Sequence, residues 1–195
     1  MLRFRTVFFA AAALLIGGCA EPVVFSEVFQ QTVNQKLYTK YNIWYTDPAR
    51  ISCLNIQYGS YIPVGTEIMP VKTSWFWDEI TFKTVKDGRE FTIKFDSGYR
   101  LCTMRDFVGY TFTTTPPEEL LNGMSDAVKD RISRGEVVPG MDQKAVLLSY
   151  GPPPACRTHD LKNESWIYWR SPKNVIRVVF RGDKVRALLN VGQSR

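Results

Sequence analysis

The sequence predicts an α+β protein with a small β barrel in its first half and a two-layer unit, helix–helix–strand–strand–strand, in its second half. Two short turns carry most of this prediction. Asp87-Gly88 lies inside a run of alternating apolar residues, 80–95, and Gly182-Asp183 lies inside a second such run, 174–190. Turn residues of this kind between alternating apolar residues indicate β-hairpins. Between the two hairpins, apolar residues recur at helical spacing.

The N-terminus has the pattern of an exported precursor. Arg3 and Arg5 supply positive charge, and residues 6–18 are uncharged and mostly apolar. This apolar run is too short to span a bilayer as a helix, which takes roughly 20 apolar residues. It therefore indicates a cleaved signal peptide rather than a permanent anchor.

A cysteine follows the apolar run in a particular context. Ile16-Gly17-Gly18-Cys19 resembles the bacterial lipobox, in which an aliphatic residue and two small residues precede a cysteine. The resemblance implies a lipoprotein signal peptide over 1–18, cleavage before Cys19, and acylation of the Cys19 sulfur and of its new amine. The alternative is an ordinary signal peptide with an incidental cysteine.

The lipobox resemblance also predicts a location. Membrane lipid would hold the chain through acylated Cys19, and residues 19–36 would form a lipidated tether. In Gram-negative lipoproteins an Asp after the cysteine tends to retain the protein at the inner membrane, whereas Ala20 stands here. We therefore expect a lipid-anchored protein of the outer membrane that faces the periplasm.

The net charge argues against one class of partner. The chain has 195 residues, with 25 Lys and Arg against 19 Asp and Glu. Removal of Arg3 and Arg5 with the signal peptide would lower the net charge from +6 to +4. A mild excess of positive charge suits a surface near anionic lipid or glycan, and it is not a nucleic-acid signature. No nucleic-acid partner is expected.

Three cysteines remain in the mature chain: Cys53, Cys102 and Cys156. An oxidising compartment permits disulfides, but an odd number leaves at least one cysteine without a partner in the same chain. Cys53 and Cys102 both lie in the first half, which favours a disulfide between them. The alternative is that all three are small apolar core residues.

Residues 37–112 are predicted to form strands, and the hairpin over 80–95 gives the clearest signal. Pairing outward from Asp87-Gly88 places Thr84 opposite Phe91, Phe82 opposite Ile93 and Ile80 opposite Phe95. Shorter runs at 41–45, 51–58 and 61–68 also favour strands. The stretch over 61–68 (Tyr-Ile-Pro-Val-Gly-Thr-Glu-Ile) resembles the loop and strand of bacterial SH3-like domains, which implies a small SH3-like β barrel over 37–112.

Residues 113–117 (Thr-Thr-Thr-Pro-Pro) are predicted to be a linker, and the pattern changes after them. Helices are expected over 118–134 and 141–150, followed by strands over 164–170, 174–181 and 184–190. Pairing outward from Gly182-Asp183 places Phe180 opposite Val185, Val178 opposite Ala187, and Ile176 opposite Leu189. The second half is therefore expected to be a two-layer α+β unit.

Several residues of the second half form a familiar pattern: Gly135, Gly140, Met141, Gly151, Pro152, Trp166 and Tyr168. A glycine-led start of the second helix, a Gly-Pro end and aromatic strands resemble the SmpA/OmlA domain of BamE-type outer-membrane lipoproteins. That domain shares its fold with the repeats of β-lactamase inhibitory protein. The resemblance covers 118–191 and implies an architecture rather than a catalytic site. The compact BamE lipoprotein has no β domain like that expected over 37–112.

One short cluster contains residue types that are typical of a catalytic site. Cys156, His159 and Asp160 lie within five residues, which suggests a thiol protease. However, catalytic pairs usually converge from separate parts of a fold, and Cys156 follows Pro-Pro-Pro-Ala in a predicted loop. One histidine and no Cys-x-x-Cys pair leave no common zinc pattern. We expect no catalytic residues, no metal site and no cofactor.

Two groups of residues are candidates for an interaction surface. Three consecutive aromatic residues, Trp75, Phe76 and Trp77, cannot all face one core because strand side chains alternate. Arg157, Arg170 and Lys173 could form a basic patch. In both cases the alternative is ordinary: core packing for the rings and a solvated face for the charges.

These observations lead to one functional prediction and one rival. The first is a non-enzymatic, lipid-anchored periplasmic scaffold or adaptor in outer-membrane assembly or integrity, with an envelope protein, such as the outer-membrane assembly machinery, as its partner. The rival is a cell-wall lipoprotein that binds peptidoglycan through the SH3-like domain.

Overall fold

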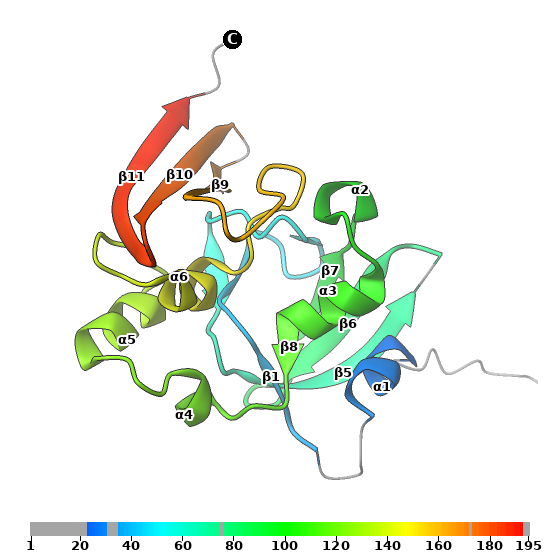
Figure 1. Cartoon of the computed structure of the whole chain (residues 1–195). Coiled ribbons are helices and arrows are strands. Elements are labelled where there is room, and N and C mark those ends of the chain that lie inside the picture. Colours follow the sequence, from blue (N-terminus) through cyan, green and yellow to red (C-terminus); the bar gives the residue numbers. More distant parts are fainter. Residues whose placement is uncertain (1–22, 31–34, 75, 172, 193–195) are drawn as a thin grey trace, which may run out of the picture.

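The computed structural model describes residues 23–30, 35–74, 76–171 and 173–192 (Figure 1). The predicted signal peptide and Cys19 lie outside the described residues. The described elements form a mixed α+β structure, which confirms the predicted class. None of the described helices is long and apolar enough to cross a membrane.

A curled six-stranded sheet with the order β3-β7-β6-β5-β1-β8 forms the first half. Its strands are β1 (Leu37–Thr39), β3 (Ile51–Ser52), β5 (Glu67–Ser74), β6 (Glu79–Thr84), β7 (Glu90–Lys94) and β8 (Phe112–Thr113). Strand β3 runs parallel to β7, and the other neighbours are antiparallel. A separate pair consists of β2 (Ile43–Tyr45) and β4 (Ser60–Ile62). Part of the expected linker, 113–117, therefore belongs to the sheet.

The expectation of strands throughout 37–112 is wrong over 97–111. This stretch forms α2 (Ser97–Arg100) and α3 (Met104–Thr111). The Thr103 hydroxyl accepts a hydrogen bond from the Asp106 backbone N–H, and the Asp106 carboxylate accepts one from the Thr103 backbone N–H. This reciprocal capping box satisfies N–H groups at the start of α3, so a helix is stable there.

Part of the expected tether, 19–36, belongs to the folded body. Residues Val23–Phe29 form α1, which packs against α3 and β5 (Figure 1). Val24 and Phe25 are fully buried, and the Phe25 ring lies 5.1 Å from the Phe112 ring. Burial removes these apolar side chains from water, and this stabilises the packing of α1 on the sheet.

The β6–β7 hairpin is present, but its register differs from the predicted one. Phe82 pairs with Phe91 and Ile80 with Ile93, a shift of two residues along one strand. A two-residue turn at Asp87-Gly88 would require positive φ at both positions, and only Gly88 has it. The Asp87 carboxylate instead accepts hydrogen bonds from the Thr84 hydroxyl and the Arg89 N–H, which closes a longer loop.

The first predicted helix of the second half is broken in two. Helix α4 (Pro117–Leu120) and α5 (Asp126–Ser133) replace the continuous helix expected over 118–134. Gly123 has a φ of +79° between them, and the Ser125 hydroxyl caps α5 by accepting from the Val128 N–H. Helix α6 (Gln143–Tyr150) agrees closely with the second predicted helix.

Strands β9 (Ser165–Ser171), β10 (Asn174–Arg181) and β11 (Lys184–Gly192) form an antiparallel sheet with β10 in the middle. Phe180 pairs with Val185 as predicted. A bulge beyond this pair shifts the register by one residue, so Val178 lies opposite Leu188 rather than Ala187. Because side chains alternate along a strand, the shift turns Leu188 toward the core and leaves Leu189 exposed.

The two halves have separate hydrophobic cores that meet at a close-packed junction. The Trp44 and Tyr61 rings of the first half lie 4.7 Å apart and stand against the end of α5. The Tyr61 hydroxyl donates a 2.6 Å hydrogen bond to the Ser133 carbonyl. A Cβ at Gly135 would lie 2.5 Å from Trp44 Cζ2. Gly135 directly follows the helix expected over 118–134, and the structure adds this close approach between the halves.

Two glycine substitutions separate backbone strain from crowding at the junction. Gly135 and Gly182 have φ values of +64° and +62°, but a Cβ at Gly182 meets nothing within 4 Å. We expect Gly182→Ala to lower the free energy of unfolding by about 1 kcal/mol from strain alone. Gly135→Ala should lower it by about 1–3 kcal/mol more, because Trp44 must move. Urea unfolding of both variants measures the difference, and equal losses would show that the contact with Trp44 is not tight.

Candidate functional site

The buried side chain of Asn42 connects the halves. Its amide nitrogen donates a 2.7 Å hydrogen bond to the Ile132 carbonyl, and its amide oxygen accepts a 2.8 Å bond from the Val64 N–H. The Asn42 backbone N–H donates to the Leu148 carbonyl at 3.1 Å. The buried side-chain amide therefore has partners on α5 and in the first half, and the backbone N–H has one on α6, as burial of polar groups requires.

Asn55 continues this junction from the loop after β3. Its amide nitrogen donates to the carbonyls of Asn42 (3.0 Å) and Tyr150 (2.8 Å), and its amide oxygen accepts from the Trp44 N–H. Asn55 has a φ of +52°, a left-handed conformation that asparagine tolerates better than most residues. The side chain thus fixes the strand after Asn42 against the end of α6.

Arg100 is a buried cation at the same junction. Its guanidinium donates twice to the Cys53 carbonyl and once, at 3.0 Å, to the Pro152 carbonyl of the second half. The group also lies 5.3 Å from the centre of the Phe107 ring. No carboxylate of the described residues forms a salt bridge with it. Neutral carbonyl dipoles hold this charge, so its positive field is not cancelled locally.

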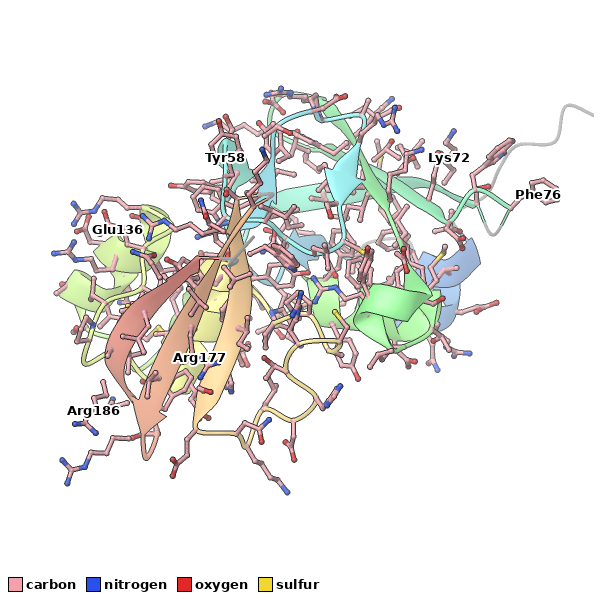
Figure 2. The ribbon with its side chains drawn as sticks, turned by 90° about the horizontal axis from the view of Figure 1, so that it is seen from above. Tyr58, Lys72, Phe76, Glu136, Arg177 and Arg186 are labelled. Atoms are coloured by element: carbon pink, nitrogen blue, oxygen red, sulfur yellow. The ribbon has the colours of Figure 1, made fainter. Side chains whose placement is uncertain are left out.

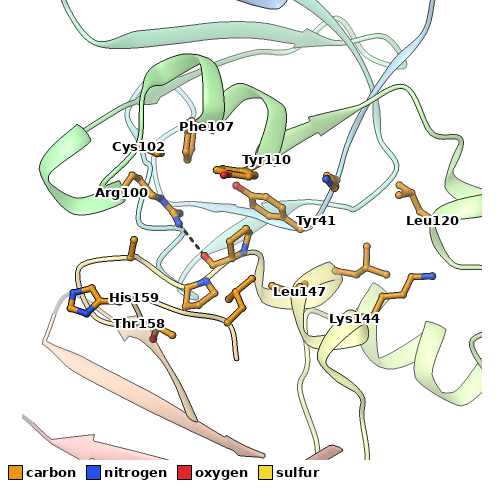
Figure 3. A pocket seen from close by; sticks show the side chains of 16 residues that line it. Tyr41, Arg100, Cys102, Phe107, Tyr110, Leu120, Lys144, Leu147, Thr158 and His159 are labelled. Atoms are coloured by element: carbon orange, nitrogen blue, oxygen red, sulfur yellow. Dashed lines mark hydrogen bonds between the residues drawn. The ribbon is translucent and has the colours of Figure 1, made fainter. Parts of the chain in front are cut away.

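A cleft of about 460 Å³ opens beside Arg100, between α3 of the first half and α6 of the second (Figure 3). Most of its lining is apolar. The apolar and aromatic lining residues are Tyr41, Cys102, Phe107, Tyr110, Leu120, Leu147, Leu148, Pro152, Pro153, Ala155 and Leu161. This volume and lining are typical of a site that buries an apolar ligand or side chains of a partner.

The charged groups of the cleft all have one sign. Lys40, Arg100 and Lys144 line it together with His159, and no Asp or Glu of the described residues does. Lys40 and Lys144 are exposed, so their ammonium groups can reach a ligand. An apolar hollow with several cations and no carboxylate is complementary to an apolar segment that carries negative charge.

A second hollow of about 420 Å³ lies on the junction near Trp44, Gln57 and Arg170. Two buried polar atoms there, Trp44 Nε1 and Gln57 Oε1, have no hydrogen-bond partner among the described residues. One is a donor and the other an acceptor, so they can bind a small polar molecule such as water. The second hollow therefore has unpaired buried polar atoms in its lining, whereas the lining of the cleft beside Arg100 is mostly apolar.

The structure separates the two groups of predicted interaction residues. Phe76 and Trp77 lie in the loop between β5 and β6 and are strongly exposed, whereas Trp75 lies outside the described residues. Figure 2 shows Phe76 at the end of the molecule opposite to Arg177 and Arg186. Phe76 is therefore remote from β10 and β11, which belong to the same sheet as β9 with its candidate Arg170.

The three basic candidates are exposed but do not form one patch. Arg157 lies over the Trp169 ring at 5.4 Å, whereas Arg170 lines the second hollow. Arg157 therefore belongs to the surface over Trp169, and Arg170 to the second hollow. Lys173 is exposed between β9 and β10.

The residues of the BamE-like pattern are placed in the core, at turns and at the junction. Trp166, Tyr168 and Met141 are buried, and Gly140 has a φ of +92° in the turn before α6. Gly151 ends α6 with a φ of +74°, and its carbonyl accepts from the Tyr168 hydroxyl. The Pro152 carbonyl, as described, accepts from Arg100.

The three cysteines of the described chain are free thiols, so the disulfide between Cys53 and Cys102 is not formed in this structure. Both side chains contact the first core, with Cys53 buried and Cys102 half-buried. Burial raises the pKa of each thiol. Burial therefore disfavours the thiolate, which is the reactive form.

Cys156, His159 and Asp160 lie in the loop that follows α6. His159 lines the cleft, but no hydrogen bond joins it to Cys156 or to Asp160 in the described structure. The Asp160 carboxylate accepts from the Lys162 N–H, as in a turn. Within the described ranges, no group of three potential metal ligands comes together.

Sequence reasoning missed the three polar side chains that join the two halves. Asn42, Asn55 and Arg100 were not singled out, because each acts through carbonyls far away in the sequence. One local signal was available: a polar Asn42 inside an apolar run that begins at Tyr41. Buried polar residues of this kind need specific partners.

The chain shows no match to any family model, to any curated protein or to any solved structure.

The thiols offer a test of burial. We expect iodoacetamide to alkylate Cys53 roughly tenfold or more slowly than Cys102, because Cys53 is buried whereas Cys102 is only half-buried and therefore more accessible to the reagent. Mass spectrometry of peptides after timed pulses gives the rates, and denatured chain, where both should react alike, is the control. Equal rates in the folded chain, or recovery of a peptide with Cys53 linked to Cys102, would contradict this.

Proposed function

We propose that this chain is a non-enzymatic, lipid-anchored adaptor of the bacterial envelope that contributes to outer-membrane assembly or integrity. In this proposal, the cleft between the two halves binds an apolar, acidic segment of an envelope protein. The observation that carries it is the cleft itself: mostly apolar walls, with basic groups and no carboxylate among the described residues that line it. The Ile16-Gly17-Gly18-Cys19 lipobox pattern supports the lipid anchor.

The junction supports a binding role because it holds both walls of the cleft in place. Tyr41 belongs to the first half and Leu148 to the second, and both line the cleft. The Asn42 backbone, next to Tyr41, is hydrogen-bonded to the Leu148 carbonyl. Because the walls of such a site are already in place, less of the binding free energy is lost to ordering the site when a ligand binds.

The finer fold assignment also belongs to the proposal. The order α5, α6, β9, β10, β11 agrees with the layout expected of a BamE-like domain over 118–191. An SH3-like domain over 37–112 is compatible with the curled sheet, although α2 and α3 lie within it. The BamE-like resemblance is the reason for placing the partner among outer-membrane assembly components.

A rival function is peptidoglycan binding through the first half. The exposed rings of Phe76 and Trp77 favour it, because aromatic rings can stack on sugar rings. The cleft favours the adaptor, because its mostly apolar walls suit apolar side chains of a protein better than the polar sugars of peptidoglycan. The two functions predict different partners.

Photo-crosslinking in intact envelopes tests the adaptor function. A photoreactive residue in place of Leu147 in the cleft should capture an outer-membrane assembly component. Lys40→Glu with Lys144→Glu should lower its capture by roughly tenfold, since like charges repel an acidic segment. The matched control is Lys162→Glu, an exposed lysine that does not line the cleft.

Three results would contradict the proposal. Capture that is unchanged by the double charge reversal would exclude the cleft as the site. Retention on purified peptidoglycan with no protein captured would favour the rival. Hydrolysis of a cell-wall substrate that Cys156→Ala abolishes would contradict both.

A further inference from the structure

The loop between β5 and β6 presents two large apolar side chains to solvent. Phe76 is 88% exposed and Trp77 is 71% exposed, more than any other large apolar side chain of the described residues. Their rings contact each other edge to face, with centres 5.7 Å apart. Solvent-exposed aromatic rings that touch each other mark a contact surface more often than isolated exposed residues do.

The loop has a fixed base. The Asp78 carbonyl accepts a 2.7 Å hydrogen bond from the Phe95 N–H, which ties the end of the loop to the end of β7. On the other side, Thr73 is buried near the end of β5. The two rings therefore project from the loop of the β5–β6 hairpin in the middle of the sheet, and these contacts fix the base of that loop.

The N-terminal end of the described chain lies at the same base. The Val24 N–H donates to the Thr73 hydroxyl, three residues before Phe76, at 3.4 Å. Val24 and the neighbouring Phe25 are fully buried, so α1 is held there by packing. Figures 1 and 2 show α1 and the β5–β6 loop at one end of the molecule, with the β9–β10–β11 sheet toward the other.

The position of α1 limits the distance from the protein to its lipid anchor. Cys19 precedes Val23 by four residues, and a fully extended chain spans at most about 14 Å over that length. Phe76 follows Thr73 by three residues, or about 10 Å at most. Acyl chains on Cys19 would thus place a membrane surface within reach of the two rings.

We propose that the β5–β6 loop is a membrane-contact loop, in which Phe76 and Trp77 insert into the interface of the bilayer that holds the acyl chains of Cys19. This inference rests on the proposed lipid anchor and adds an orientation to it. Tryptophan favours the membrane–water interface because its ring is apolar with one polar edge. Insertion would place the first half next to the membrane and the β9–β10–β11 sheet away from it.

The charges near the loop indicate an apolar contact rather than an electrostatic one. Lys72 and the exposed Asp78 flank the rings with opposite charges, and the nearby Glu79 is paired with Lys94. The residues that the structure describes around the loop carry no excess of positive charge that would attract anionic lipid. Insertion should therefore occur in zwitterionic membranes and change little with salt.

Fluorescence quenching tests the loop in the full, lipidated chain. The chain is reconstituted in phosphatidylcholine vesicles whose acyl chains carry bromine, which quenches tryptophan on contact. Trp166 is fully buried, and the indole nitrogens of Trp44 and Trp169 are also buried, so these rings should contribute little. We expect clear quenching, reduced at least twofold in Phe76→Ser with Trp77→Ser. Tyr58→Ser with Leu189→Ser, two exposed residues elsewhere, is the matched control and should leave quenching unchanged.

The outcomes distinguish the loop from the anchor. Mass spectrometry of the N-terminal peptide shows whether Cys19 is acylated, and an unmodified cysteine would overturn both the anchor and the inference. Acylated protein without quenching, or with equal quenching in the loop variant, would overturn the inference alone. Quenching that requires anionic lipid would contradict the apolar contact. Loss of peptidoglycan retention in the loop variant, with quenching unchanged, would assign the rings to glycan.

Discussion

Asn42 is the residue on which the joining of the two halves depends. Its side chain and backbone bond to α5, to α6 and to the loop before β5, in a region that excludes solvent. A buried donor or acceptor left without a partner costs about 1–3 kcal/mol, so a small displacement of one half would leave several such groups unpaired. Asn55 adds one bond across the same contact, to the Tyr150 carbonyl, and a second bond to the Asn42 carbonyl within the first half. The network therefore selects one docking geometry, whereas apolar packing alone would tolerate several.

The cleft and the proposed orientation both follow from this geometry. One wall of the cleft comes from each half, and Arg100 bridges them through the Cys53 and Pro152 carbonyls. Because neutral groups hold this buried cation, a negatively charged ligand would gain from its field. The same docking places α1 and the β5–β6 loop at one end and the second sheet at the other. A membrane contact at one end would leave the cleft on the side of the molecule, open to a partner.

The local parts of this structure could be predicted from the sequence, and the non-local parts could not. Strand β10 and helix α6 follow from periodicity and turn residues within a few positions. The β6–β7 register was missed because the Asp87 side chain closes a longer loop than its Asp-Gly pair suggests. Helix α3 had a readable signal, the Thr103 and Asp106 capping box, which apolar strand patterns obscured. Asn42 is hydrogen-bonded to Ile132, which is 90 residues away in the sequence. A pattern of neighbouring residues cannot predict a contact over that separation.

Denaturation with one probe in each core tests the joining of the halves most directly. Fluorinated phenylalanine at Phe82 reports on the first core, and at Phe180 on the second. If the Asn42 junction makes one cooperative body, both fluorine signals should change at the same urea concentration and with the same slope. Two separate midpoints would show that each half unfolds on its own. That result would contradict the account of a cleft with walls held in place by the junction.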